Sequence, residues 1–499
     1  MSEQQDKIND IFSLDVELLK QTETLPLKSK TTITTNLSTD QQLGLAAVLE
    51  WLNRAFRGKT EDNFFALTGS AGTGKTTLVD TILKSLPDKY LKSKVCVCAP
   101  THKAKKVIGE KTGWKILETL QALLGIKMDT NLEDFDPNNP AFNAIGERKM
   151  NNYWLVVIDE ASMVNTELKI AIEDCAKLSG TLVLYVGDTK QLNPVKEYTI
   201  SAALTSPINN YNLTQIMRQG EGNPLIVLLD ALRYDIENNT YTYIDHLKKL
   251  DTIGKSGEGY QVTNAQDFAA ALKKYYTSDE FRENKNYCRY IAWTNDSIQT
   301  TNNYVRDKVF NFNNSTGELD EIILSYKTIV DEDDIILTNS DDYIIEKIED
   351  YIISDYTYPI QVKHVHLRGI DTGIVSKVNL LTKNLENYQN YVSIYRSELE
   401  RAQRIGGKRG WSKFYDFKKK VLVLENIFTG FKDKWNKDEI IKKDIDYGYG
   451  ITIHKSQGST YNTVFVNGKD INRNSNELER KRLWYVALSR ASHKVYINL

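Results

Sequence analysis

The segment 69–76 fits the pattern G-x-x-x-x-G-K-T, which binds nucleotide phosphates when it connects a strand to a helix. The apolar run 64–67 precedes it, and apolar residues recur at helical spacing after it. The glycines let backbone N–H groups turn toward one point, where the helix N-terminus adds partial positive charge. Lys75 is expected to reach the terminal phosphates, and the Thr76 hydroxyl to hold a magnesium ion. The pattern therefore predicts that the chain binds a nucleoside triphosphate.

The whole loop and the residue after it are expected to surround the phosphates. We expect the nucleotide to contact Gly69, Ser70, Ala71, Gly72, Thr73, Gly74, Lys75, Thr76 and Thr77.

Two adjacent carboxylates follow another strand of the same predicted sheet. The apolar run 154–158 ends directly before Asp159 and Glu160. One carboxylate can hold magnesium, and the other can polarise an attacking water. An acidic helix cap is the alternative interpretation. Beside a phosphate loop, the pair predicts triphosphate hydrolysis, with Thr76 and Asp159 as the magnesium ligands and Glu160 acting on the water.

Two glutamines lie where they could contact the same nucleotide. Gln191 follows the strand 181–186, and its amide could sense the γ-phosphate at the edge of the site. Gln41 lies one predicted helix before the phosphate loop, and its amide can both donate and accept hydrogen bonds to adenine. A surface glutamine without a ligand is the ordinary alternative for Gln41.

The elements that position these residues alternate as strand and helix, which predicts an α/β fold with a parallel sheet. Ligand chemistry in such sheets gathers at the carboxyl ends of the strands. The second half repeats part of the pattern, since the strand 287–293 is followed by Thr294 and Asn295 as the strand 94–99 is followed by Pro100 and Thr101. No second phosphate loop occurs. The second half is therefore predicted to be a similar fold without its own nucleotide.

Two segments interrupt this pattern. The segment 124–150 is too polar for a core and is predicted to leave the first sheet. The segment 306–443 contains short alternating runs that predict a small β-barrel, followed by a helix with an apolar stripe. Lys and Arg clearly outnumber Asp and Glu between Arg401 and Lys443.

The bulk composition limits the class of protein. The chain has 499 residues, of which 41% are hydrophobic and 26% charged, and its net charge is −2. These values indicate a globular protein of two to four domains, and no apolar run is long enough to predict a membrane span. The N-terminus lacks a secretory signal, and four scattered cysteines do not form a disulfide framework. We expect a protein of the reducing cytoplasm, and the AT-rich codon bias implied by Asn, Ile, Lys and Tyr suggests a phage in a bacterial host.

Taken together, these strings resemble superfamily 1 DNA helicases of the 5′→3′ branch, the group of RecD and the phage Dda proteins. The resemblance covers nearly the whole chain from Leu37. The strings follow the family order: Gln41, 69–76, 100–102, 159–162, 187–191, Arg218, 294–295, 454–458 and 486–490.

The resemblance implies two RecA-like parallel-sheet cores, an inserted SH3-like β-barrel domain and a short hairpin insertion. The implied boundaries are a loose arm at 1–36, the first core at 37–123 and 151–205, the hairpin insertion at 124–150, the second core at 206–305 and 444–499, and the inserted barrel with a helical extension at 306–443.

It also implies ATP as the nucleotide, magnesium as the cofactor, and DNA as the partner. The residues implied to act in hydrolysis are Lys75, Glu160, Gln191, Arg218 and Arg490, with Gly458 also beside the nucleotide. The residues implied to contact DNA are Pro100, Thr101, His102, Thr294, Asn295, Thr452, His454 and Lys455. Phe135 and Phe142 lie in the hairpin insertion, and Phe135 is the preferred candidate for the pin that separates the strands. The alternative is that these rings pack the hairpin onto the first core.

The implied activity is ATP-dependent movement 5′→3′ on single-stranded DNA with duplex unwinding. The alternative is a DNA-stimulated ATPase that displaces bound proteins without processive unwinding. Single-stranded DNA and forked duplexes are the expected partners, with single-strand-binding or replication proteins as further candidates. We expect a monomer that does not associate with membranes.

Overall fold

The computed structural model describes most of the chain, and Asp40–Leu499 form one compact unit. The described residues are 37–58, 62–86, 92–127, 146–216, 223–249, 252–313, 315–331, 334–432 and 436–499. None of the helices in these ranges is long and apolar enough to cross a membrane.

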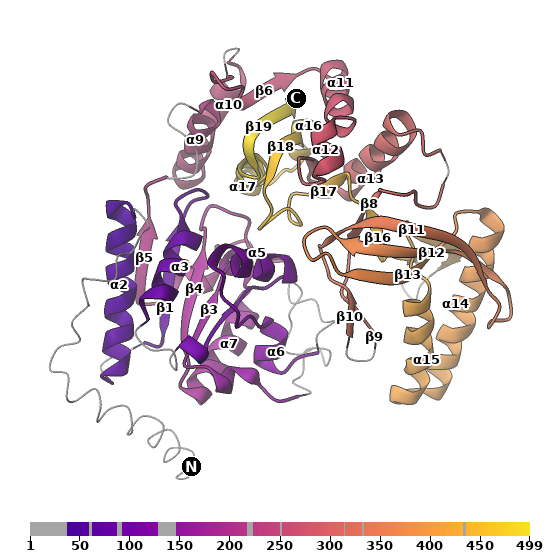
Figure 1. The fold of residues 1–499 in the computed structure, drawn as a ribbon, viewed down its shortest axis with the longest axis horizontal. Helices are drawn as coiled ribbons and strands as arrows, with labels where there is room; N and C mark the ends of the chain where they lie inside the picture. Colours follow the sequence, from indigo (N-terminus) through magenta and orange to yellow (C-terminus); the bar gives the residue numbers. More distant parts are fainter. Residues whose placement is uncertain are drawn as a thin grey trace, which may run out of the picture. The chain divides into compact units, whose positions relative to one another are not determined.

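The first sheet is parallel and has the strand order β2-β3-β4-β1-β5 (Figure 1). Its strands are β1 (Phe64–Gly69), β2 (Val95–Cys98), β3 (Leu155–Ile158), β4 (Leu182–Gly187) and β5 (Asn209–Leu213). All residues of β1 to β4 are buried, which explains why these strands are continuous apolar runs in the sequence. The predicted α/β core is thereby confirmed.

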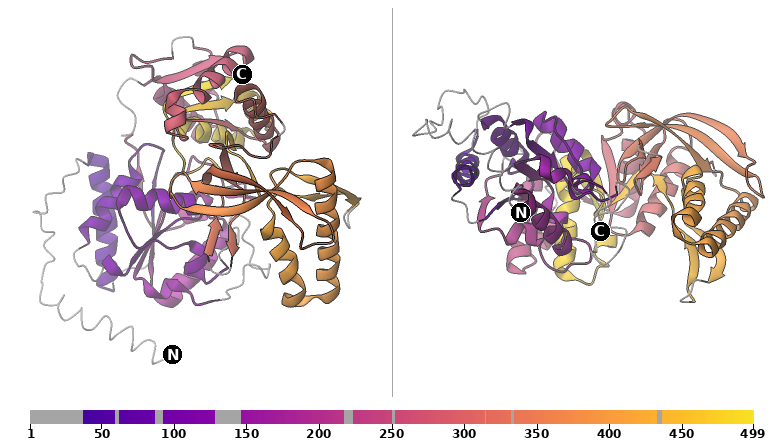
Figure 2. Two further views of the ribbon diagram at one scale, coloured as in Figure 1. Left: turned by 45° about the vertical axis from the view of Figure 1, so that its right-hand side comes forward. Right: turned by 90° about the horizontal axis from the view of Figure 1, so that it is seen from below.

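Helices cover both faces of this sheet (Figures 1 and 2). One face packs against α2 (Thr39–Phe56), α3 (Lys75–Ser85) and α5 (His102–Thr112), and the other against α6 (Leu120–Leu124), α7 (Thr166–Ser179) and α8 (Ala202–Thr205). The short turns η3 (Lys149–Asn152) and η4 (Ala161–Met163) complete this part. One predicted boundary is wrong: β5 pairs with β1 and belongs to the first core, whereas the sequence places 206–305 in the second core.

The second sheet is also parallel, in the order β17-β7-β18-β19-β6. Its strands come from two distant stretches: β6 (Gly259–Thr263) and β7 (Cys288–Ala292), then β17 (Gly450–Thr452), β18 (Tyr461–Asn467) and β19 (Ala491–Asn498). Its helices are α9 (Pro224–Asn238), α10 (Thr242–Leu247), α11 (Ala265–Tyr276), α12 (Asp279–Glu283), α13 (Asn295–Tyr304), α16 (Gly468–Ile471) and α17 (Glu477–Ser489). The π-helical turn η5 (Val305–Val309) follows α13.

The inserted region forms an antiparallel sheet in the order β13-β12-β11-β8-β16. Its strands are β8 (Ile322–Ser325), β11 (Asp342–Ile353), β12 (Ile360–Gly369), β13 (Val375–Leu381) and β16 (Ile445–Tyr447). Two hairpins flank it, β9 (Ile329–Asp331) with β10 (Asp334–Leu337), and β14 (Ile427–Lys432) with β15 (Asp438–Ile441). The helices α14 (Leu385–Ile405) and α15 (Gly407–Lys420) pack on its far end (Figure 2).

This sheet differs from the predicted closed barrel. Within the described residues β13 and β16 are its two edges, and the pairings do not join them. β16 has only three residues and passes almost directly into β17 of the second sheet, so it is too short to close a barrel. A second predicted boundary is also wrong: β16 pairs with β8 of the inserted sheet, whereas the sequence places 444–499 in the second core.

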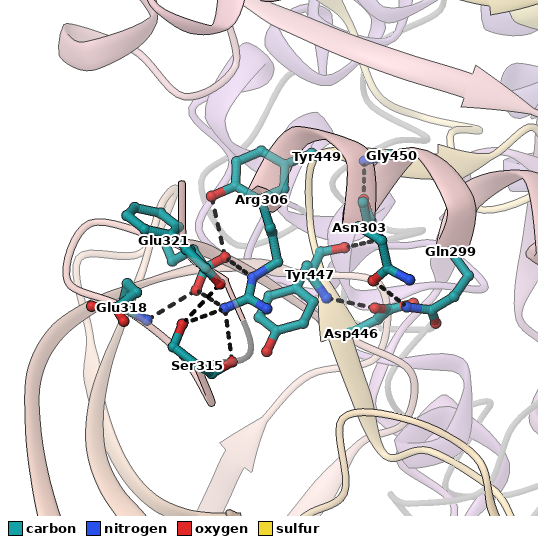
Figure 3. Close-up of polar contacts among 12 residues, drawn as sticks. Gln299, Asn303, Arg306, Ser315, Glu318, Glu321, Asp446, Tyr447, Tyr449 and Gly450 are labelled. Carbon is teal, nitrogen blue, oxygen red and sulfur yellow. Dashed lines mark hydrogen bonds and ion pairs between the residues drawn. The ribbon is translucent and has the colours of Figure 1, made fainter. Parts of the chain in front are cut away.

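The chain passes between the second sheet and the inserted sheet through a buried polar junction (Figure 3). The Arg306 guanidinium donates from Nε to Glu321 Oε1 at 2.5 Å and lies 3.8 Å from the centroid of the Tyr447 ring. Glu321 also accepts from the Tyr449 hydroxyl at 3.3 Å. A second buried pair, Arg289 and Asp342, joins β7 to β11. One apolar cluster contains side chains of both sheets. The two sheets therefore share a core.

Candidate active site

The phosphate loop begins where β1 ends at Gly69 and stops where α3 begins at Lys75. Gly72 and Gly74 have φ values of 90° and 81°, in the left-handed region that favours glycine. A Cβ at Gly74 would overlap the Gln41 amide nitrogen, and one at Gly69 would lie 2.7 Å from the Thr73 hydroxyl oxygen. The backbone conformation therefore favours glycine at 72 and 74, and the lack of space for a Cβ requires glycine at 69 and 74.

Two side chains brace this loop. Lys75 Nζ donates to the carbonyl oxygens of Gly69 at 2.6 Å and Ser70 at 3.1 Å, so its ammonium is held at the mouth of the loop. Gln41 is buried and donates from Nε2 to the Thr73 carbonyl oxygen at 3.1 Å. Gln41 therefore lies at the nucleotide loop, and adenine recognition by its amide stays a prediction.

The acidic pair lies beside the loop, at the end of β3. Burial, followed by the charge of Glu160, raises the pKa of Asp159 to about 7, and Lys75 acts in the opposite direction. A cation beside Asp159 would therefore stabilise its ionised form. The Asp159 carboxylate and the Thr76 hydroxyl offer the hard oxygen donors that magnesium prefers, so these residues fit the expected cofactor.

Glu160 adopts a strained backbone conformation, with φ of 52° at a residue that is not glycine. Such strain concentrates at functional sites. A Cβ placed on Gly458 of the second core would lie 3.8 Å from Glu160 Oε1, which puts these two predicted site residues side by side.

The predicted γ-phosphate sensor, Gln191, lies in the loop after β4 and is held by the second core. Its Oε1 accepts from Gln457 Nε2 at 3.1 Å. Arg482 on α17 donates to the carbonyl oxygens of Thr189 at 2.7 Å and Gln191 at 2.5 Å. Lys190 in the same loop forms an ion pair with Glu237 on α9. The loop that carries Gln191 is thus held in place by side chains of the second core.

Two residues that the sequence analysis did not select also contact the phosphate loop. The Tyr485 hydroxyl on α17 accepts from the Ala71 N–H at 2.8 Å and donates to Asp188 Oδ2 at 2.8 Å. Arg233 on α9 donates to the Ala71 carbonyl oxygen at 3.2 Å and lies over the Tyr485 ring. Tyr485 lies directly before the matched string 486–490, and that position was the only available signal.

Arg490, the predicted finger, is buried in the second core. It donates to the carbonyl oxygens of Val486 at 3.1 Å and Ser459 at 3.3 Å, and to the Ser489 hydroxyl at 2.8 Å. These bonds hold the loop that follows β17, where Gln457 and Gly458 lie. Its finger role stays a prediction. Arg218 lies outside the described residues.

The predicted DNA-contact threonines occupy equivalent positions in the two cores. Thr101 caps α5 after β2, and its hydroxyl accepts from the Ala104 N–H at 3.2 Å. Thr294 caps α13 after β7, accepts from the Ser297 N–H at 3.3 Å and donates to Asp470 at 2.8 Å. Each helix N-terminus offers the positive end of a dipole to a phosphate.

The other predicted DNA contacts divide into placed and unplaced residues. Pro100 directly precedes Thr101, Asn295 is the first residue of α13, and Thr452 is the last residue of β17. Burial lowers the pKa of His454, which favours its neutral form. The His102 side chain and Phe135 lie outside the described positions.

Lys455 reaches from the loop after β17 into the inserted region. Its ammonium donates to Asn339 Oδ1 at 3.1 Å and Ser340 Oγ at 3.3 Å, and lies 4.6 Å from the centroid of the Tyr326 ring. A DNA phosphate would have to share this ammonium with the Asn339 and Ser340 side chains.

Two family models match parts of the chain that contribute strands to the two parallel sheets. Residues 54–254 match the family described as AAA domain, and residues 447–498 match the UvrD-like helicase C-terminal domain. An uncharacterised protein of Acanthamoeba polyphaga mimivirus is 27% identical over 513 residues, covering 92% of this chain and 99% of that protein. The ATP-dependent DNA helicase Dda of Enterobacteria phage T4 is 24% identical over 467 residues, covering 88% and 95%.

A third relative, the ATP-dependent RecD2 DNA helicase of Deinococcus radiodurans, is 35% identical over 162 residues, which is 32% of this chain and 20% of that protein. Dda and RecD2 are named as helicases of the group that the sequence strings resemble. The chain therefore belongs to the group of superfamily 1 helicases that contains Dda, RecD and Pif1.

Proposed function

We propose that this chain is an ATP-dependent DNA helicase that moves 5′→3′ along single-stranded DNA and separates duplex strands. Membership of the helicase group supports ATP hydrolysis and action on DNA, since Dda and RecD2 are named as ATP-dependent DNA helicases. The direction of movement rests on the resemblance of the sequence strings to the 5′→3′ branch.

The observation that carries this proposal is the contact of the two cores at the nucleotide loops. Ala71 of the phosphate loop and Asp188 of the sensor loop both bond to Tyr485 of the second core, and Gln191 bonds to Gln457. Phosphate binding and release at these loops would alter the bonds that join the cores. A change in the spacing of the cores is what stepping along a strand requires.

The residues at the first core supply the chemistry of hydrolysis. Lys75 would exchange its two carbonyl partners for phosphate oxygens, because a charge-assisted bond to phosphate is stronger. Glu160 would orient the attacking water and accept its proton. Magnesium, bound by Thr76 and Asp159, would neutralise charge on the phosphoryl oxygens. Arg218 would act as a γ-phosphate sensor and Arg490 as the finger, a role worth ~10³–10⁵ in rate.

The DNA strand would lie across the N-termini of α5 and α13, one from each core, with Thr101 and Thr294 at their caps. Phosphate contacts of this kind do not read sequence. Single-stranded and forked DNA are the proposed partners, and single-strand-binding or replication proteins are candidates for further contacts. We propose a monomer that acts in the cytoplasm of a host cell.

Unwinding of paired forked substrates tests this function. Labelled duplexes with a 5′ or a 3′ single-stranded tail should differ, with ATP-dependent separation of the 5′-tailed duplex only. A preference for the 3′-tailed duplex would reject the direction. ATP hydrolysis stimulated by single-stranded DNA without strand separation would instead support the protein-displacing translocase.

A further inference from the structure

The hydroxyl of Tyr485 joins two nucleotide-site loops of the first core to a helix of the second. It accepts from the Ala71 N–H and donates to Asp188, both at 2.8 Å. Tyr485 is fully buried and Asp188 is 1% exposed, so water cannot replace either bond without rearrangement. A hydroxyl that both donates and accepts is fixed in orientation, which makes the bridge specific to tyrosine.

Arg233 also bonds to Ala71. Its Nη2 donates to the Ala71 carbonyl oxygen at 3.2 Å, and its guanidinium lies 5.5 Å from the centroid of the Tyr485 ring. Both backbone polar groups of Ala71 are therefore bonded to side chains of the second core. The backbone N–H groups of this loop are the groups that surround phosphate. The second core thus holds the phosphate loop directly.

We propose that Tyr485 is a positioning residue that couples the phosphate loop and the Asp188 loop to the second core during hydrolysis. This inference rests on the proposed ATP hydrolysis. Lys75, Thr76 and the loop amides lie on the first core and bind nucleotide there. Tyr485 lies on the second core and determines how that core is positioned against the phosphate loop. Its hydroxyl therefore acts on turnover more than on nucleotide affinity.

The test is Tyr485→Phe, which keeps the buried ring under Arg233 and removes only the hydroxyl. The value of kcat for DNA-stimulated ATP hydrolysis should fall roughly 10-fold, the effect of losing a buried bond to a charged group. The KM for ATP should change by less than about threefold, because ground-state phosphate contacts remain.

Tyr461→Phe is the matched control. Tyr461 is 2% exposed, lies under the Arg289 guanidinium at 5.0 Å, and its hydroxyl has no hydrogen-bond partner among the described residues. Removal of that hydroxyl should leave kcat at the wild-type value. A loss equal to that of Tyr485→Phe would show that any buried hydroxyl matters, and would overturn the inference.

Asp188→Asn reaches the same bond from the other side. The double variant with Tyr485→Phe should lose no more activity than the worse single variant, because both remove one interaction. Additive losses, an unchanged kcat in Tyr485→Phe, or a raised KM at unchanged kcat would each overturn the coupling role. A wild-type chain without DNA-stimulated hydrolysis would overturn the proposed function, and the inference with it.

Discussion

At the phosphate loop, the Lys75 ammonium and the Ala71 backbone are already bonded to protein partners. Lys75 bonds to two loop carbonyl oxygens, and Ala71 bonds to Tyr485 and Arg233. Neutral carbonyl oxygens attract an ammonium less strongly than phosphate oxygens do. The lysine is therefore preorganised, and nucleotide binding requires an exchange of partners with little movement of the loop.

Lys75→Ala should abolish ATP hydrolysis and leave single-stranded DNA binding within a few-fold of wild type. The lysine lies at the phosphate loop, whereas the proposed strand contacts are at α5 and α13. Steady-state hydrolysis and fluorescence anisotropy with a labelled oligonucleotide measure the two effects. Lys84→Ala on the same helix is the control, because Lys84 is exposed and pairs with Asp80. Equal losses of binding and hydrolysis in Lys75→Ala would contradict a separate DNA channel.

Arg490→Ala should reduce DNA-stimulated turnover far more than nucleotide affinity, because a finger acts on charge that develops in the transition state. Arg490 also holds the carbonyl oxygen of Ser459, so Arg490→Lys is needed as a second variant. It keeps the positive charge but lacks the planar fork. Turnover at saturating ATP and affinity for a non-hydrolysed analogue measure the two quantities. Weaker affinity with unchanged turnover would make Arg490 an ordinary binding residue.

Among the elements of the first core, the described residues on either side of 128–145 lie close together. The Gly146 N–H donates to the Gly125 carbonyl oxygen at 3.2 Å, so the two ends of the segment are adjacent. Residues 128–145, which include Phe135, lie outside the described part of the chain. The hairpin insertion at 124–150 and the role of Phe135 stay predictions.

Phe135→Ala should impair duplex unwinding and spare both DNA-stimulated ATP hydrolysis and movement on single strands. An aromatic ring at a fork can stack on the terminal base pair, a contact worth ~1–3 kcal/mol per base. Unwinding of a 5′-tailed fork and displacement of streptavidin from single-stranded DNA measure the two activities. Phe142→Ala is the matched comparison in the same segment. Loss of all three activities would show that Phe135 is structural.

At the scale of the whole molecule, the inserted sheet and the second sheet share one hydrophobic cluster and a buried ionic junction. Arg306 is 5% exposed and Glu321 is fully buried. Only two residues, Gly448 and Tyr449, separate β16 from β17. A connection of two residues beside a shared core is too short and too buried to act as a hinge. These two sheets should therefore move as one body during ATP hydrolysis.

Glu321→Ala should lower the free energy of unfolding by about 3–5 kcal/mol, because it leaves the Arg306 charge buried and unpaired. Hydrogen exchange followed by mass spectrometry should show faster exchange in β7 and β17 as well as in β8. Glu349→Ala is the control, since its pair with Lys347 is exposed and should matter little. Faster exchange confined to the inserted sheet would contradict a shared body.

The sequence predicts the strands of the first core and the phosphate loop correctly. The runs that form β1 to β4 are apolar because both faces of a parallel sheet are buried, and the glycines of the loop are required locally. It did not determine closure of the inserted sheet. Alternating residues predict strands, but closure depends on whether the edge strands are long enough to pair, and β16 has three residues.

Which residues of the second core touch the nucleotide loops could not be predicted from the sequence. Ala71 and Tyr485 are 414 residues apart, and Gln191 and Gln457 are 266 apart. Residues 481–489 of α17 are all buried, so their periodicity does not mark a face directed at the first core. The contact depends on how two finished sheets dock, and side chains that become neighbours only by docking leave no local pattern in the sequence.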